Sequence, residues 1–182
     1  MLFFGDASFT ADPRTVLATL RHTLEELPTH PEGPRLHSAL TAALVQAGIL
    51  TQSLADAPGE AGARESLTLT TSLAHSLWRS FRTGGRAAAP SGLPLAPLEA
   101  AALPARVRLR RPEGFALYGL EPEAYALAAR ALAPHRDGLV VLGLRSIGTT
   151  LAAMVAAGAR SDRIPFTVRP TAHPWSREVR LP

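Results

Sequence analysis

The stretch Gly138-Leu139-Val140-Val141-Leu142-Gly143 is a continuous apolar run flanked by glycines. Runs of this kind are typical of strands that are buried on both faces, as in parallel sheets covered by helices. The loop Gly143-Leu144-Arg145-Ser146-Ile147-Gly148-Thr149-Thr150 follows the run, and an alanine-rich helix is expected from Thr149 to Ala159. The stretch therefore predicts a strand, a loop and a helix that together form one corner of an α/β sheet.

The segments on either side extend this pattern. Residues 106–110 alternate between arginine and apolar side chains, which predicts a half-exposed strand, and 115–118 are expected to form a second strand or its continuation. A helix is expected from Glu121 to Pro134 because a proline and acidic residues open it. Another strand is expected at 164–168. The alternation of strands and helices predicts an α/β fold for residues 105–182.

The first part of the chain carries apolar side chains at helical spacing instead. Asp12 is a suitable N-cap for a helix that runs to Pro28. A second helix is expected from near Pro34, with a break or turn at Gly48 and a separate short helix after it. The leucines between 67 and 81 predict a further helix.

These patterns divide the chain into three parts. Residues 1–83 are predicted to form a helical unit, and residues 105–182 a partial α/β domain. The segment 84–104 between them is rich in proline and glycine and has no clear periodicity, which predicts a linker with at most a short helical turn near 95–103.

Composition narrows the classes of function. Hydrophobic residues make up 46% of the chain and charged residues 19%, which is typical of a globular protein. The absence of cysteine excludes disulfides, cysteine-ligated zinc, iron–sulfur clusters and thiol nucleophiles. The start of the chain lacks the features of a signal peptide, and no stretch approaches the roughly 20 apolar residues of a membrane span. We therefore expect a cytoplasmic protein with no membrane contact.

The net charge of +4 comes entirely from arginine, since the chain contains no lysine. Complete replacement of lysine by arginine is typical of codon bias in a GC-rich genome. Arginine also suits phosphate and nucleic acid. However, a charge this small is weak support for a polyanion partner, so nucleic acid binding is not indicated.

The loop after the apolar strand carries the chemistry. In open α/β sheets ligands bind outside the carboxyl ends of the strands, where helix N-termini attract anions. Arginine adds a charge-assisted contact to phosphate, hydroxyls add donors, and glycine permits close approach. We therefore predict a phosphate or pyrophosphate site formed by Arg145, Ser146, Gly148, Thr149 and Thr150. Similar loops also occur without any ligand, and this one matches neither the Walker motif nor the dinucleotide motif.

A second candidate patch follows the last predicted strand. Arg169, His173 and Arg177 lie close together in the sequence, and Trp175 between them is able to stack on a base. The alternative is a surface turn whose tryptophan packs on the edge of the sheet. The other histidines have no metal-ligand spacing, so no metal site is predicted through histidine.

Three stretches, 112–125, 143–151 and 169–177, resemble an uncharacterised bacterial group of phosphoribosyltransferase-like proteins. The resemblance covers about residues 106–182. In type I phosphoribosyltransferases the corresponding loop holds the pyrophosphate of phosphoribosyl pyrophosphate, a role that would fall to Arg145, Ser146, Gly148 and Thr149. The resemblance implies Mg²⁺ as cofactor, and transfer to, or phosphorolysis at, a nitrogenous base as the reaction.

One departure from that family leaves the activity open. The strand with paired acidic residues and a Gly/Thr-rich loop, which binds the ribose phosphate in the family, is absent from this sequence. The chain is then either the first part of a longer enzyme or a remnant that cannot perform the transfer alone. A second hypothesis is a non-catalytic nucleotide-binding or regulatory protein, whose N-terminal helices dock a protein partner or a second copy. A third is a basic nucleic-acid module, which only the arginine content supports.

Overall fold

The computed structural model describes residues 8–110, 115, 119–132, 139–145, 147–171, 178 and 179. Its elements, in chain order, are β1 (Ser8–Ala11), α1 (Pro13–Glu26), α2 (Pro34–Ala55), α3 (Ala63–Arg82), α4 (Ala96–Ala100), β2 (Val107–Arg110), α6 (Pro122–Leu132), β3 (Leu142–Leu144), α7 (Gly148–Ala159) and β4 (Phe166–Val168). Short 3-10 turns follow α1 and α2. The fold is mixed α/β, and each of the two described sheets contains two strands.

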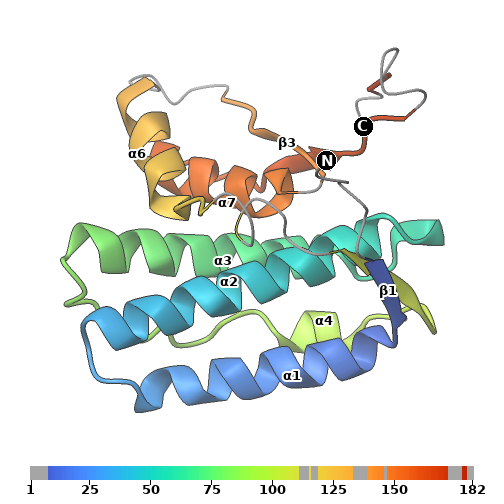
Figure 1. Cartoon of the computed structure of the whole chain (residues 1–182), viewed down its shortest axis with the longest axis horizontal. Helices are drawn as coiled ribbons and strands as arrows, with labels where there is room; N and C mark the ends of the chain where they lie inside the picture. The colour runs from blue at the N-terminus through green and yellow to red at the C-terminus, as the bar shows by residue number, and fades with distance from the viewer. Residues whose placement is uncertain are drawn as a thin grey trace, which may run out of the picture.

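The elements stack in layers around the hairpin of α2 and α3 (Figure 1). In that view α1 and α4 lie on one side of the hairpin, and α6 and α7 lie on the other. The strand β3 lies beyond α7, away from the hairpin. A single hydrophobic core joins these layers, because buried residues of α1, α2, α3, α6 and α7 pack in one cluster.

Local sequence signals explain where α1 begins. Asp12 caps the helix, since its carboxylate accepts a hydrogen bond of 2.8 Å from the backbone N–H of Arg14. Pro13 occupies the first turn, where a missing N–H has no cost. Leu17 and Leu20 are buried on the inner face. The predictions of this helix, and of α3 over the leucines from 67 to 81, are confirmed.

The predicted break at Gly48 is wrong, because α2 runs unbroken from Pro34 to Ala55. Glycine inside a helix costs about 1 kcal/mol relative to alanine but does not end it unless other signals agree. Here a tertiary contact explains the residue: a Cβ at position 48 would lie 2.0 Å from Oγ1 of Thr150 in α7. The glycine therefore marks the place where α7 crosses α2.

The helix α2 is long and apolar enough, by length and composition alone, to cross a membrane. The expectation that no stretch approaches such a span was therefore wrong. Its most apolar 18-residue window has a mean hydropathy of 1.2, and 61% of that window is buried inside the protein. Core helices of soluble proteins meet the same criteria.

The pairing of β1 with β2 joins the predicted helical unit to the start of the predicted α/β domain. Strand β1 lies within the predicted helical unit, yet it pairs in antiparallel register with β2, so that Ser8 is opposite Arg110 and Ala11 opposite Val107. The strand at 107–110 was predicted, but it lies against the bundle and not in the parallel sheet. In the predicted linker, the short turn is α4, and its Leu98 is completely buried in the common core.

The second sheet contains the predicted parallel strands. β3 pairs in parallel with β4, with Leu142 opposite Phe166 and Leu144 opposite Val168, and α7 connects the two strands. The helices expected at 121–134 and 149–159 are confirmed as α6 and α7. The strand expected at 115–118 lies, apart from Phe115, outside the described residues.

The expectation that the apolar run is buried on both faces is wrong. Val141 and Gly143 are buried against α7, where Val141 packs on Ala152 and Ala156. The opposite face carries exposed side chains of Val140 (57%) and Leu142 (43%). Although the run is continuously apolar, the described residues cover only one face of this sheet.

Candidate functional site

The carboxyl ends of β3 and β4 lie beside the C-terminal end of α2. The register of the parallel pair places Arg145 directly after β3, and its backbone N–H donates to the carbonyl oxygen of Val168 at 2.7 Å. Arg169 directly follows β4. The two predicted arginines therefore come from adjacent strand ends, which is the edge where ligands of open α/β sheets bind.

The guanidinium of Arg145 is surrounded by protein acceptors. Its Nη1 donates to the carbonyl of Ala55 at 2.7 Å and to Oδ1 of Asp56 at 3.3 Å. Its Nε donates to Oγ1 of Thr167 at 3.2 Å, and its Nη2 donates to the carbonyl of the same residue at 3.1 Å. Only 13% of the side chain is exposed. Arg145 thus ties the strand ends to α2.

Arg169 meets the same carboxylate from the other strand. Its Nε donates to Oδ1 of Asp56 at 2.7 Å, and its Nη2 pairs with Oδ2, which is the bidentate geometry of guanidinium and carboxylate. Glu60 adds a second carboxylate, with Oε1 at 3.7 Å from Nη2 of Arg145. We call Asp56, Glu60, Arg145 and Arg169 the Asp56 cluster. Asp56 is 19% exposed and Glu60 62%.

The loop residues take several different positions. Gly148 packs on Gly143, where a Cβ would lie 2.2 Å from the Gly148 carbonyl oxygen. Thr150 is buried against α2 at Gly48. Thr149 is fully buried, and its hydroxyl has no hydrogen-bond partner within the described structure. The two threonine hydroxyls are therefore turned toward the interior of the protein.

The N-terminus of α7 retains the property on which the prediction depended. Among the described residues no side chain caps this helix, and the N–H of Leu151 donates to the carbonyl of Ile147 at 3.2 Å. The N–H groups of residues 148–150 precede that bond, so they have no partner within the helix. The positive end of the helix dipole thus lies next to the loop that holds Arg145.

Three predicted residues lie outside the described part of the chain: Ser146 of the loop, and His173 and Arg177 of the second patch. Arg169 is the residue of the second patch that the structure describes. It lies beside Arg145, because both arginines bind the carboxylate of Asp56. Asp56 and Glu60 were missed by sequence reasoning. No local pattern indicates them, because Asp56 meets partners 89 and 113 positions further along the chain.

Among the described residues there is no group of three or more histidines, aspartates or glutamates that could hold a metal ion. The carboxylate of Asp56 already accepts from two guanidiniums. Mg²⁺ prefers carboxylate, water and phosphate oxygens. The described residues therefore do not fit a Mg²⁺ ion held by protein carboxylates alone, and such an ion would have to be bound through the phosphates of a ligand.

A separate polar cluster links α6 to the bundle. Nδ1 of His37 lies 3.1 Å from Oγ of Ser80, and its Nε2 lies 3.0 Å from Oε1 of Glu123. A serine, a histidine and a carboxylate in a row suggest hydrolase chemistry. However, Ser80 is completely buried and its hydroxyl cannot reach a substrate. The arrangement instead satisfies the buried carboxylate of Glu123 and fixes the start of α6 on α2 and α3.

Comparisons of the chain with models of known protein families, with characterised proteins and with solved structures give no match. The resemblance to phosphoribosyltransferases stays a prediction from the sequence.

Proposed function

We propose that the Asp56 cluster and the N-terminus of α7 form a site for the phosphate or pyrophosphate group of a phosphoribosyl or nucleotide ligand. One observation carries the proposal: two guanidiniums, from the ends of adjacent parallel strands, converge on a single negative group. This group is the carboxylate of Asp56. The site therefore already binds an anion, which comes from the protein itself.

An incoming phosphate would exchange with Asp56 mainly at Arg169. This arginine is 26% exposed and uses Nε and Nη2 for its pair with the carboxylate. A guanidinium holds a phosphate through the same fork that it offers to a carboxylate. Arg145 keeps its bonds to Ala55 and Thr167 and contributes positive charge, and the N–H groups of residues 148–150 contribute further donors.

The proposal concerns binding first. Mg²⁺ would accompany a pyrophosphate ligand, bound to its oxygens, and would neutralise part of its charge. A more specific version of the proposal adds enzymatic transfer of a phosphoribosyl group, which the sequence resemblance supports. Binding without turnover is its alternative. No feature of the described residues favours nucleic acid.

Asp56→Asn is expected to bind pyrophosphate more tightly than the unchanged protein. The substitution removes the competing negative charge, while the amide oxygen can still accept from the arginines. A partly exposed ion pair contributes about 1 kcal/mol, so the dissociation constant should fall roughly five-fold. Arg169→Gln should raise it about ten-fold. Isothermal titration calorimetry with pyrophosphate, and with phosphoribosyl pyrophosphate and Mg²⁺, measures both effects.

Arg163→Gln is the matched control, because this exposed arginine precedes β4 and so lies at the opposite end of the strand. Its affinity should match that of the unchanged protein within a factor of two. No heat of binding from either the unchanged protein or Asp56→Asn would refute the site. Equal losses of affinity in Arg163→Gln and Arg169→Gln would show that pyrophosphate is held by general charge attraction and not at a specific site.

A second candidate function, self-association, rests on the outer face of the β3–β4 sheet. Val140, Leu142, Leu144 and Phe166 are between 43% and 57% exposed there. Parallel sheets are normally covered on both faces, and contiguous apolar patches mark interfaces. A second copy is the occupant we propose, because an uncharged apolar patch is complementary to itself under two-fold symmetry.

We expect this association to be weak. Four half-exposed side chains offer less than the roughly 800 Å² per partner of a standard interface, so a dissociation constant on the order of 100 μM is expected. Sedimentation equilibrium should show concentration-dependent dimers that Leu142→Glu abolishes. Phe9→Ser, which removes an exposed apolar side chain from β1, should leave them unchanged. A monomer at every concentration up to about 1 mM would exclude this interface.

A further inference from the structure

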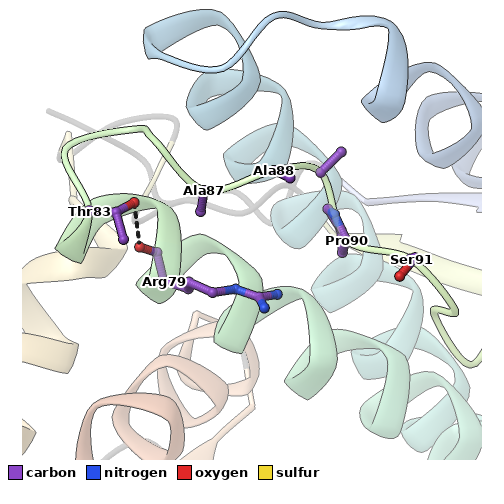
Figure 2. Close-up of a pocket in the computed structure, with 7 residues that line it drawn as sticks. Arg79, Thr83, Ala87, Ala88, Pro90 and Ser91 are labelled. Atoms are coloured by element: carbon purple, nitrogen blue, oxygen red, sulfur yellow. Dashed lines mark hydrogen bonds between the residues drawn. The ribbon is translucent and has the colours of Figure 1, made fainter.

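A cavity of about 470 Å³ lies between the C-terminal part of α3 and the extended segment 87–91 (Figure 2), at the opposite end of this helix from Glu60. Its volume lies in the range of small-molecule sites, about 300–1,000 Å³. The cavity is lined by two residues of the helix end and five of the segment, namely Arg79, Thr83, Ala87, Ala88, Ala89, Pro90 and Ser91. One wall therefore carries a cation, and the other is mainly methyl groups and a proline ring.

Arg79 is the charged group of this cavity. In Figure 2 its side chain extends from α3 beneath the segment, toward Pro90 and Ser91. No carboxylate, carbonyl or hydroxyl oxygen of the described residues accepts a hydrogen bond from its guanidinium. This differs from Arg145 and Arg169, whose guanidiniums are paired with Asp56. Arg79 is thus an exposed donor fork at the wall of the cavity, and its guanidinium has no acceptor among the described residues.

The stretch of chain around Arg79 carries positive charge and no acidic residue. The sequence contains no aspartate or glutamate from 66 to 98, while Arg82 and Arg86 lie on the same stretch. The effect reaches His75, one helical turn away. Loss of hydration is the main cause that lowers the pKa of His75, Asp162 opposes the shift, and the charge of Arg79 adds to it. No carboxylate of this stretch therefore competes with an anion for Arg79, although Asp162 acts on the same histidine.

We infer that this cavity binds a carboxylate carried on a short apolar body. The planar fork of Arg79 matches a carboxylate in bidentate geometry, and the Ser91 hydroxyl offers another donor. The methyl groups of Ala87 and its neighbours, with the ring of Pro90, would contact the apolar part of the ligand. The volume is ample for an apolar part of a few carbon atoms or one small ring.

The position of the cavity favours a carboxylate over a phosphate dianion. Arg79 lies in the last turn of α3, where the carbonyl groups place the negative end of the helix dipole. A dianion would meet this negative field with only one guanidinium in the lining to balance it. A single negative charge needs no more than that guanidinium. The same chemistry occurs in free short-chain organic acids and at the C-terminus of a peptide that ends in an apolar residue.

Titration of ¹⁵N-labelled protein, followed by NMR, tests the inference with both sources of carboxylate. The probes are 4-methylpentanoate and the peptide acetyl-Ala-Leu, each compared with its amide. Saturable shifts at millimolar concentrations are expected for the backbone signals of 87–91 with one or both free acids, and the amides should bind at least ten-fold more weakly. The acid that binds identifies the source. Equal binding of acid and amide, or no saturable shift with either acid, would overturn the proposal.

Two substitutions test the cavity itself. Arg79→Gln should weaken binding about ten-fold, whereas Arg82→Gln, its neighbour on the same helix outside the lining, should change it less than two-fold. Ala87→Leu keeps the guanidinium but fills the space, because its methyl points from the segment toward α3 in Figure 2. It should also weaken binding about ten-fold. Unchanged binding in Arg79→Gln or in Ala87→Leu, with the fold intact by circular dichroism, would overturn this assignment.

Discussion

Gly158→Ala is expected to lower the free energy of unfolding by about 3 kcal/mol, although glycine to alanine inside a helix ordinarily raises it by about 1 kcal/mol. The reason is the contact between α6 and α7. A Cβ at position 158 would lie 2.1 Å from the carbonyl oxygen and 2.6 Å from the Cα of Ala126. Both are backbone atoms of α6, so relief requires one helix to move away from the other.

Urea denaturation followed by circular dichroism measures this loss. Addition of Ala126→Gly is the informative control, because the clash involves the backbone of residue 126 and removal of its methyl group leaves the clash in place. The double variant should therefore be no more stable than Gly158→Ala. A midpoint for Gly158→Ala equal to or above that of the unchanged protein would mean that α6 and α7 are not in such close contact.

The elements that local signals determine could be predicted from the sequence. The cap at Asp12 with Pro13 after it defined the start of α1, and apolar spacing predicted α3, α6 and α7. Each of these signals lies within a few residues of the structure that it specifies. The parallel strands could also be located, because the helix between them is short and the apolar run is distinctive.

The other features of the fold and of the site depend on contacts between residues that are distant in the sequence. Hydrophobic periodicity does not encode such contacts. Nothing near Ser8 indicates that it faces Arg110, about a hundred positions away. The candidate site shows the same limit. Arg145 was predicted for its chemistry, but its partner Asp56 is specified by the packing of α7 across α2. The sequence thus indicated the basic half of the Asp56 cluster and gave no indication of the acidic half.

Gly48 illustrates how one residue type can have two meanings. In isolation it favoured a helix break, whereas in the structure it is the contact point for Thr150. We expect Gly48→Ala to lower the free energy of unfolding by about 2 kcal/mol, since the new methyl group would lie 2.0 Å from Oγ1 of that threonine. The clash is with a side chain, so it differs in kind from the clash at Gly158.

A double-mutant cycle separates the two kinds of clash. Thr150→Ala removes the hydroxyl oxygen and should cost about 1 kcal/mol by itself, because the side chain is buried. In that background Gly48→Ala should no longer destabilise, since the nearest remaining atom, the Cβ of residue 150, is 3.2 Å away, and the better helix propensity of alanine then contributes. A favourable coupling of about 2 kcal/mol is expected from denaturation midpoints. Additive effects of the two substitutions would show that α7 does not cross α2 at this glycine, and the placement of Arg145 against Asp56 would lose its support.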